Sequence, residues 1–291
     1  MFPDFIQFTR GHASIWIDQR LADGAFIDRL ADADQFFREP SCQVIKDQRK
    51  IKVGRLTLEI AGAPHCIYIK RYNAFSLRYR LASPFIRSGA FRALQGAAIL
   101  RAANIPTAIP IAAVETRVRR TIAKSFFITE AIAHGKTVDD YWREELGGLS
   151  GAEGFQLRRA FLKSLAQLFH NLHRQGIYHN DLKDANILAV RKASKGAVGF
   201  FLLDLEGVKR YAPLSEKRRI KNLVQLHRTL GRTLRRTDKL IFLQHYLGAA
   251  FADRETHRRL IARLLRSSRR LDAVKARPAG ARVVGKKASH G

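Results

Sequence analysis

The chain is organised around residues 177–188, which read Ile-Tyr-His-Asn-Asp-Leu-Lys-Asp-Ala-Asn-Ile-Leu. This stretch is a short polar loop between two apolar segments, and it presents Asp181, then Lys183, then Asn186. A carboxylate can accept the proton of an attacking hydroxyl, an ammonium group can meet a moving phosphoryl group, and a carboxamide oxygen can hold Mg²⁺. The loop therefore indicates phosphoryl transfer, with Asp181 and Lys183 as the candidate catalytic residues.

A second polar group follows at the end of an apolar strand pattern. Residues 200–203 read Phe-Phe-Leu-Leu and are followed by Asp204, with Gly207 three positions later. The end of a buried strand is a rigid place for a metal ligand, so we expect Asn186 and Asp204 to hold Mg²⁺ together. The joint spacing is far more specific than a lone glycine loop, and the alternative interpretation is a polar turn between core strands.

These two motifs resemble those of the protein-kinase-like superfamily, with His-Asn-Asp-Leu-Lys-Asp-Ala-Asn as the catalytic loop and Asp-Leu-Glu-Gly as the metal motif. The resemblance implies an α+β fold of two lobes, a small β-rich N-terminal lobe and a mainly helical C-terminal lobe, that uses ATP and Mg²⁺. A chain of 291 residues has about the length that such a fold needs. We expect the first lobe at 1–130, the catalytic lobe at 131–275, and a disordered basic tail at 276–291.

The N-terminal lobe should contain a three-strand meander between residues 42 and 72. Leu56, Leu58 and Ile60 alternate with polar residues, and a turn at 61–64 leads into another alternating run at 65–71. In a kinase-like fold the resemblance gives Lys70 the place of the strand lysine that contacts the nucleotide phosphates. The alternative is a surface lysine on an edge strand.

The segment that would cover the nucleotide is poor in glycine. Only Gly54 lies near the expected turn, and there is no G-x-G-x-x-G. Lys52 and its basic neighbours could supply cations in place of backbone amides, or they could form a plain solvated strand. Residues 126–131 resemble the hinge between kinase lobes, which makes Glu130 a further candidate nucleotide contact.

A protein kinase places a Glu in the helix after the lysine strand, and this chain does not. There is no Asp or Glu between Lys70 and Val114. The candidates to orient Lys70 are Gln95 on the expected helix, or Glu130 or Asp204 from elsewhere. If none does, Lys70 is unpaired and the activity is weak or lost.

The remaining elements follow from periodicity and from breaker residues. We expect two short helices within residues 1–40, a helix at 76–103, a hairpin of 114–118 with 124–129, a helix at 155–175, strands at 187–191 and 199–204, and helices at 216–236 and 255–271.

The later helices decide the branch of the superfamily. The chain has no Ala-Pro-Glu activation segment, and residues 217–226 and 236–248 are similar to the lipopolysaccharide core kinases, the Kdo/heptose kinase family. Residues 69–72 and 104–107 carry the same resemblance, which spans roughly 40–250. It implies phosphorylation of an inner-core sugar hydroxyl on lipopolysaccharide, or on another anionic glycolipid, at the cytoplasmic face of the inner membrane.

The charge is extreme, at +28, and more than half of the excess follows residue 215, where 21 Lys and Arg face 5 Asp and Glu. Such a balance favours a polyanionic partner. Residues 255–271 form a basic amphipathic pattern that could dock on an anionic membrane, or that could be a last lobe helix with a wet arginine face. We expect no obligate nucleic-acid partner.

Neither a signal peptide nor an apolar run long enough to span a membrane is visible, so we expect a cytoplasmic protein that meets the membrane peripherally. Two other functions compete with the sugar kinase. A non-catalytic kinase-like regulator would explain the missing helix Glu and the thin glycine loop. An atypical protein or RNA-associated kinase would explain the charge.

Overall fold

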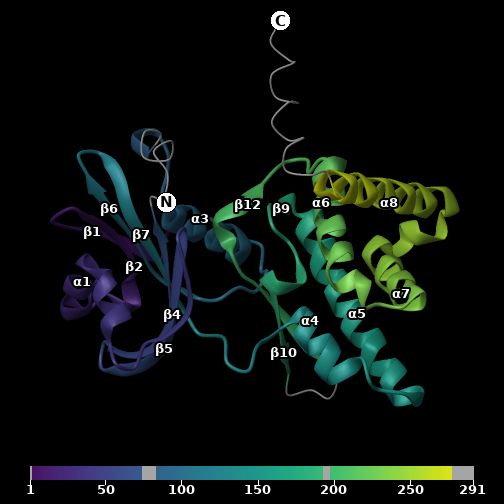
Figure 1. The fold of residues 1–291 in the computed structure, drawn as a ribbon, viewed down its shortest axis with the longest axis horizontal. Helices are drawn as coiled ribbons and strands as arrows, with labels where there is room; N and C mark the ends of the chain where they lie inside the picture. Colours follow the sequence, from purple (N-terminus) through teal and green to yellow (C-terminus); the bar gives the residue numbers. More distant parts are fainter. Residues whose placement is uncertain (1, 74–82, 193–196, 277–291) are drawn as a thin grey trace, which may run out of the picture. The chain divides into compact units, whose positions relative to one another are not determined.

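The computed structural model of the chain describes residues 2–73, 83–192 and 197–276 (Figure 1). The chain divides into two compact units. The first comprises Met1–Gly135, Leu188–Arg191 and Gly199–Arg210, and the second comprises Lys136–Ile187, Lys192–Val198 and Tyr211–Gly291. The first is β-rich and the second is mainly helical, as predicted. Part of the expected helix at 76–103 and nearly all of the expected tail lie outside the described residues.

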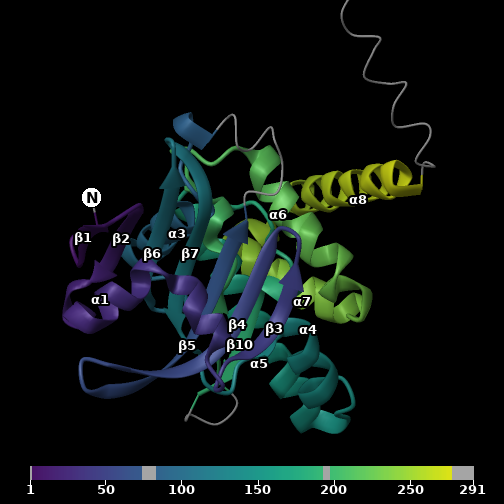
Figure 2. The same cartoon turned by 60° about the vertical axis from the view of Figure 1, so that its left-hand side comes forward.

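The first unit is built on an antiparallel sheet in the order β1-β2-β6-β7-β5-β4-β3 (Figure 2). Its strands are β1 (Phe5–Arg10), β2 (Ala13–Asp18), β3 (Gln43–Gln48), β4 (Ile51–Ile60), β5 (Ala63–Asn73), β6 (Pro110–Val118) and β7 (Thr121–Glu130).

The structure confirms the meander and corrects its bounds. Gly54, which was expected near a turn, lies within β4, where Val53 and Gly54 pair with Lys70 and Ile69 of β5. The hairpin of β6 and β7 is confirmed. The two short helices expected within residues 1–40 are present as α1 (Gly24–Ala31) and a 3-10 helix at Ala33–Arg38, but the strands β1 and β2, which were not expected, precede them and join the sheet.

One face of this sheet carries the core. Alternate residues of β2, β4, β5 and β7 pack there with the buried side of α1, as Ile15, Leu56, Ile69 and Phe126 illustrate. A second helix, α3 (Gly89–Ala102), begins at Ser88, whose hydroxyl accepts from the Phe91 amide. It lies on the opposite face, where its first residue meets the Tyr72 ring of β5. Residues that alternate along β5 therefore belong to two different environments.

The first unit also contains β10 (Ile187–Arg191), β11 (Val198–Leu202) and β12 (Val208–Arg210), apart from one terminal residue each of β10 and β11. The predicted strands at 187–191 and 199–204 are thereby confirmed, the second ending two residues early. The elements of the second unit are β8 (Lys136–Thr137), α4 (Val138–Tyr141), α5 (Gly151–Arg174), β9 (Ile177–His179), α6 (Glu216–Arg228), α7 (Arg236–Leu247) and α8 (Arg254–Ala276).

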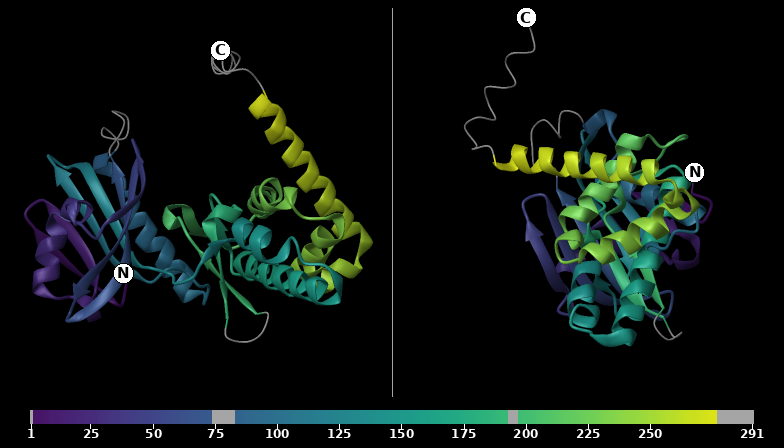
Figure 3. Two further views of the ribbon diagram at one scale, coloured as in Figure 1. Left: turned by 60° about the horizontal axis from the view of Figure 1, so that its bottom comes forward. Right: turned by 90° about the vertical axis from the view of Figure 1, so that its right-hand side faces the viewer.

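Within the second unit, α5 packs along α7, and α8 packs against α6 (Figure 3, where α8 is yellow). The prediction of one helix at 216–236 is wrong, because Thr229 leaves the helical region at φ −111° and ψ −98° and the chain restarts as α7 at Arg236. No helix in the described ranges is both long and apolar enough to cross a membrane.

Candidate active site

The polar loop predicted to be catalytic begins where α5 ends. Gly176 takes φ +74°, a left-handed conformation that favours glycine, and a Cβ there would lie 2.0 Å from the Tyr211 carbonyl oxygen. The turn sends the chain into β9, and the loop of residues 180–186 follows β9 directly. The long amphipathic helix therefore fixes where the loop starts.

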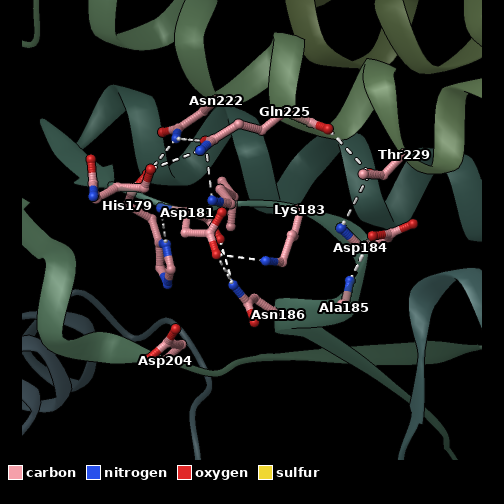
Figure 4. Close-up of polar contacts among 12 residues, drawn as sticks. His179, Asp181, Lys183, Asp184, Ala185, Asn186, Asp204, Asn222, Gln225 and Thr229 are labelled. Atoms are coloured by element: carbon pink, nitrogen blue, oxygen red, sulfur yellow. Dashed lines mark hydrogen bonds and ion pairs between the residues drawn. The ribbon is translucent and has the colours of Figure 1, made fainter. Parts of the chain in front are cut away.

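The three predicted loop residues come together (Figure 4). Lys183 Nζ donates to Asp181 Oδ2 at 2.8 Å, and Asn186 Nδ2 donates to the same oxygen at 3.0 Å and to the Asp181 carbonyl at 2.7 Å. Two donors on one carboxylate oxygen fix its orientation. The Asp181 side chain is 44% exposed, so an acceptor from solution can reach it.

Two side chains of α6 form hydrogen bonds with the backbone of the loop (Figure 4). Asn222 Nδ2 donates to the His179 carbonyl at 2.5 Å, and Gln225 Nε2 donates to the Asn180 carbonyl at 2.7 Å. Gln225 Oε1 also accepts from the Leu182 amide at 3.1 Å. These bonds satisfy backbone groups on both sides of Asp181, so α6 sets the path of the loop. Sequence reasoning did not identify either residue as part of the site.

His179 supports the loop internally, since its Nδ1 accepts from the Asp181 amide at 3.2 Å. Asp184 is buried, and the sequence analysis did not identify it as a residue of the site. Its carboxylate accepts from the Ala185 amide at 2.7 Å, while its own amide lies 3.5 Å from the Thr229 hydroxyl (Figure 4). Burial raises the pKa of Asp184 above its ordinary value. Its contacts shape the short turn at Asp184–Asn186 that carries Asn186.

A buried chain of polar contacts continues from Asn222 into the unit. His173 Nε2 lies 3.4 Å from Asn222 Oδ1, and His173 Nδ1 lies 2.8 Å from the Tyr246 hydroxyl. Because Asn222 Nδ2 donates to the loop, its Oδ1 is the acceptor, so His173 donates through Nε2 and accepts from Tyr246. Burial lowers the pKa of His173 to about 4, which keeps the ring neutral. His173 is therefore a buried hydrogen-bonding residue that links α5 to α6 and α7.

Lys70 and Asp204, which were predicted to act on the nucleotide and the metal ion, lie in the first unit. Lys70 on β5 forms an ion pair with Asp204, which follows β11. Asp204 takes φ 58°, a left-handed conformation uncommon for a non-glycine residue. The strand before it is anchored by the Thr107 hydroxyl, which donates to the Leu202 carbonyl at 2.7 Å. The proposed metal ligand thus has the predicted place at a strand end.

Of the three candidate partners of Lys70, only one contacts it. Gln95 is exposed on α3, and Glu130 lies 3.7 Å from His65. Asp204 is the carboxylate that pairs with Lys70, so the alternative that left this lysine unpaired is wrong. The helix α3 contributes a cation instead of the usual acid, because Arg92 lies 3.5 Å from Glu206.

Two further candidates lie on the other face of the sheet. Lys52 pairs in register with Arg71, while Lys70 pairs with Val53, so the two lysines point to opposite sides. Lys52 contacts Asp47 at 3.1 Å and lies over the Phe37 ring. Glu130 lies on the core face with Phe126 and Ile128, because every second residue of β7 points to the same side of the sheet. The structure brings neither side chain to Lys70.

Asn186 in the second unit and Asp204 in the first each carry an oxygen donor of a kind that suits a magnesium ion held partly by phosphates. No group of three His, Cys, Asp or Glu side chains within the described ranges could hold a metal alone. Mg²⁺ prefers hard oxygen ligands and is commonly bound by one or two protein groups together with nucleotide phosphates. Asn186 offers its Oδ1, since Nδ2 is turned to Asp181, and Asp204 offers a carboxylate. Both residues fit that role.

Comparisons with known proteins agree on one group. The model of the lipopolysaccharide kinase (Kdo/WaaP) family matches residues 47–246. A solved structure described as WaaP in complex with acyl carrier protein is similar at 22% sequence identity and a TM-score of 0.58. The match covers 86% of this chain and 97% of that one. A direct search with the sequence found no match among curated proteins.

Proposed function

The chain belongs to the lipopolysaccharide kinase (Kdo/WaaP) family, and from this membership we propose how its residues divide the work of the reaction. The protein is an ATP-dependent kinase that phosphorylates a sugar hydroxyl of the lipopolysaccharide inner core. The observation that carries the assignment of roles is the contact of Lys183 and Asn186 with one oxygen of Asp181.

Asp181 aligns the acceptor hydroxyl and takes its proton as the oxygen attacks. A carboxylate that is held in a fixed orientation and still open to solvent suits this role. Lys183 neutralises negative charge on the phosphoryl group during transfer, which is the largest demand that this reaction places on a protein. Asn222 and Gln225 keep the backbone of the loop in the geometry that both side chains need.

Lys70 and Asp204 act on the nucleotide. We assign the α- and β-phosphates to Lys70 and a magnesium ion to Asp204 and Asn186, on the basis of their positions in the kinase-like motifs and their oxygen donors. When bound, the ion neutralises phosphate charge. The assignments of Lys52 and Glu130 to the nucleotide stay predictions, and neither side chain lies on the face of the sheet that carries Lys70.

The test of the catalytic assignment is Asp181→Asn. The amide keeps the size of the side chain and cannot accept the proton, so we expect the turnover number to fall by about 10²–10⁴. ATP binding should be unchanged, because no role in nucleotide binding is assigned to Asp181. Phosphate transfer from labelled ATP to purified inner-core lipopolysaccharide and ATP affinity by calorimetry are measured side by side. Wild-type turnover in the variant contradicts the assignment.

We also propose that the protein works at the cytoplasmic face of the inner membrane, where its acceptor is a glycolipid. The basic helix α8 would meet the anionic lipid surface. Its arginines at 258, 266, 269 and 270 are exposed, and Leu271 beside them is 42% exposed. Cations next to exposed apolar side chains are typical of helices that bind an anionic interface.

A further inference from the structure

The first turns of α6 carry an unusual concentration of positive charge. Lys217, Arg218, Arg219 and Lys221 lie within the first six residues of the helix. The positive end of the helix dipole makes cations unfavourable there. Glu216, the acid of this turn, forms an ion pair with Arg263 of α8. Helix stability therefore does not explain the four cations.

Two of these cations are placed against tyrosine rings. The Arg218 guanidinium lies 3.7 Å from the centroid of the Tyr211 ring, and Lys221 Nζ lies 5.4 Å from that of Tyr178. The two rings meet edge to face, with centroids 6.4 Å apart. One continuous cluster results, in which each cation rests on an aromatic face, an arrangement that orders long side chains.

The cluster adjoins the catalytic loop through Asn180, the residue before Asp181. Lys221 Nζ donates to Asn180 Oδ1 at 2.9 Å, and the Tyr178 hydroxyl donates to the same oxygen at 3.2 Å. Asn180 and Lys221 are exposed, and Arg218 is half-buried. The cluster thus presents the exposed side chains of Asn180 and Lys221 over the buried Tyr178 ring, one residue away in the chain from the proposed catalytic Asp181.

We propose that Tyr178, Tyr211, Arg218 and Lys221 form the acceptor subsite, which binds a negatively charged substituent of the sugar that is phosphorylated. The inference rests on the proposed function and names the residues that select its acceptor. Arg218 and Lys221 meet a carboxylate or phosphate group of the sugar by charge-assisted hydrogen bonds. The buried Tyr178 ring positions Lys221, and the half-buried Tyr211 ring packs against the apolar face of the sugar. Arg218 and Lys221 lie three residues apart on one side of α6, so a bound anion also relieves their mutual repulsion.

The test compares Lys221→Gln and Arg218→Gln with Lys217→Gln, which removes an exposed cation from the same turn without touching the cluster. A hydrogen bond to a charged group is worth about 1.5–3 kcal/mol, so each of the first two changes should raise the KM for the acceptor about 10- to 100-fold. The turnover number and the KM for ATP should stay within about twofold, because the interaction is uniform binding. Lys221→Arg should restore most of the affinity.

The acceptor is an inner-core oligosaccharide released from its lipid, so that membrane attraction does not contribute. Dephosphorylated and carboxyl-reduced forms of it distinguish the two sources of the anion. Wild-type affinity should fall for the form that lacks the recognised group, and a variant that carries both Lys221→Gln and Arg218→Gln should not distinguish that form from the intact acceptor. Equal affinity of the wild type for all three forms overturns the proposal, and so does an equal effect of Lys217→Gln.

Equilibrium binding of the oligosaccharide without ATP separates this inference from the proposed function. If the wild type binds the acceptor through Arg218 and Lys221 but transfers no phosphate, the subsite is supported and the kinase function is contradicted. If the wild type transfers phosphate and the two variants bind and react like it, the function stands and the subsite is wrong. If neither binding nor transfer occurs, both are wrong.

Discussion

Lys70 has neighbours of two kinds in the first unit. It pairs with the Asp204 carboxylate, and its ammonium group lies 4.9 Å from the centroid of the Tyr72 ring. The acid expected on α3 is replaced by Arg92, which faces Glu206. Burial raises the pKa of Glu206, and the charges of Lys70 and Arg92 act in the opposite direction. The carboxylates of this cluster therefore come from the segment after β11, and the helix supplies the balancing cation.

His173 makes stability depend on pH. Its pKa is about 4 in the folded protein, mainly because the ring is buried, and about 6.5 in an unfolded chain. Between those values the unfolded state binds more protons, so the free energy of unfolding falls as the pH falls. The loss develops through that window and reaches about 3 kcal/mol below pH 4. Urea unfolding at pH 7.5 and pH 5 measures most of it.

The matched variant is His173→Gln, which keeps polar atoms near Tyr246 and Asn222 and does not titrate. It should lose about 2 kcal/mol less than the wild type between the two pH values. All other titrating groups are common to both proteins, including Glu206 and Asp184, whose raised pKa values act in the opposite direction. An equal loss in both proteins would show that His173 is not the source.

Sequence reasoning found the loop residues because their spacing is local. Asp181, Lys183 and Asn186 lie within six positions, and their contacts follow from one short turn. Their supports could not be found in this way. Asn222 and Gln225 meet the loop across more than forty positions, and no spacing rule joins a helix to a distant loop. The sequence of α6 carried part of the resemblance to the family. In the structure, Asn222 and Gln225 of this helix hold the backbone of the catalytic loop.

At the scale of elements, α3 is pressed onto the segment that carries Asp204. Gly96 of α3 lies so close that a Cβ would stand 2.2 Å from the Leu205 carbonyl oxygen. A backbone atom cannot move aside as a flexible side chain can. Close packing of this helix therefore fixes the residue next to the proposed metal ligand, and only glycine permits it.

Gly96→Ala should displace α3 or the Leu205 backbone. Overpacking of this kind costs about 1–3 kcal/mol, so we expect a lower melting temperature. Affinity for ATP should fall as well, because the displaced backbone carries Asp204, the partner of Lys70. Differential scanning fluorimetry with and without ATP measures both effects.

Gly148→Ala is the control, since nothing lies within 4 Å of a Cβ at that position. It should leave the melting temperature and the ATP affinity unchanged. Should Gly96→Ala behave in the same way, α3 does not position Asp204.

The elements that sequence reasoning missed lack strong local signals. Ile15 and Ile17 alternate with Ser14 and Trp16 along β2, but the run is only six residues long and pairs with the distant β6. The helix α6 ends at Arg228, and the residue that follows it, Thr229, is not a typical helix-ending residue such as Gly or Pro. Hydrophobic periodicity continues through it, because Leu226 and Leu230 are both buried. In both places the pairing or packing with distant residues decided the structure.

For the whole molecule, the net charge of +28 is not spread evenly along the chain. In α8, some charged residues form ion pairs with α6 and other arginines are exposed. Arg263 pairs with Glu216, and Asp272 pairs with Arg228, so ion pairs fasten α8 to α6. Leu260 and Leu264 line a cavity of about 220 Å³ with side chains of α6 and α7. The helix is therefore part of the second unit, and its remaining exposed arginines are available to an outside partner.

The membrane proposal is tested by a variant that keeps this packing. Changing Arg258, Arg266, Arg269 and Arg270 to Gln removes exposed charges and leaves the ion pairs and leucines in place. Each basic residue near an anionic surface contributes about 1 kcal/mol, so binding to vesicles with phosphatidylserine should weaken by on the order of a hundredfold or more. Sedimentation with vesicles at low and high salt measures the change, and removal of residues 255–291, which removes the same charges, should weaken binding at least as much.

The control removes the same charge elsewhere, by changing Arg38, Lys46, Arg119 and Arg120 to Gln, all of which are exposed in the first unit. If binding reflects the net charge of the molecule alone, both four-residue variants weaken it equally, because long-range attraction depends on total charge. If α8 is the surface that meets the lipid, only the first variant weakens it, since attraction decays within about a Debye length of roughly 8–10 Å. Equal weakening, or none in either variant, contradicts the assignment of the membrane contact to α8.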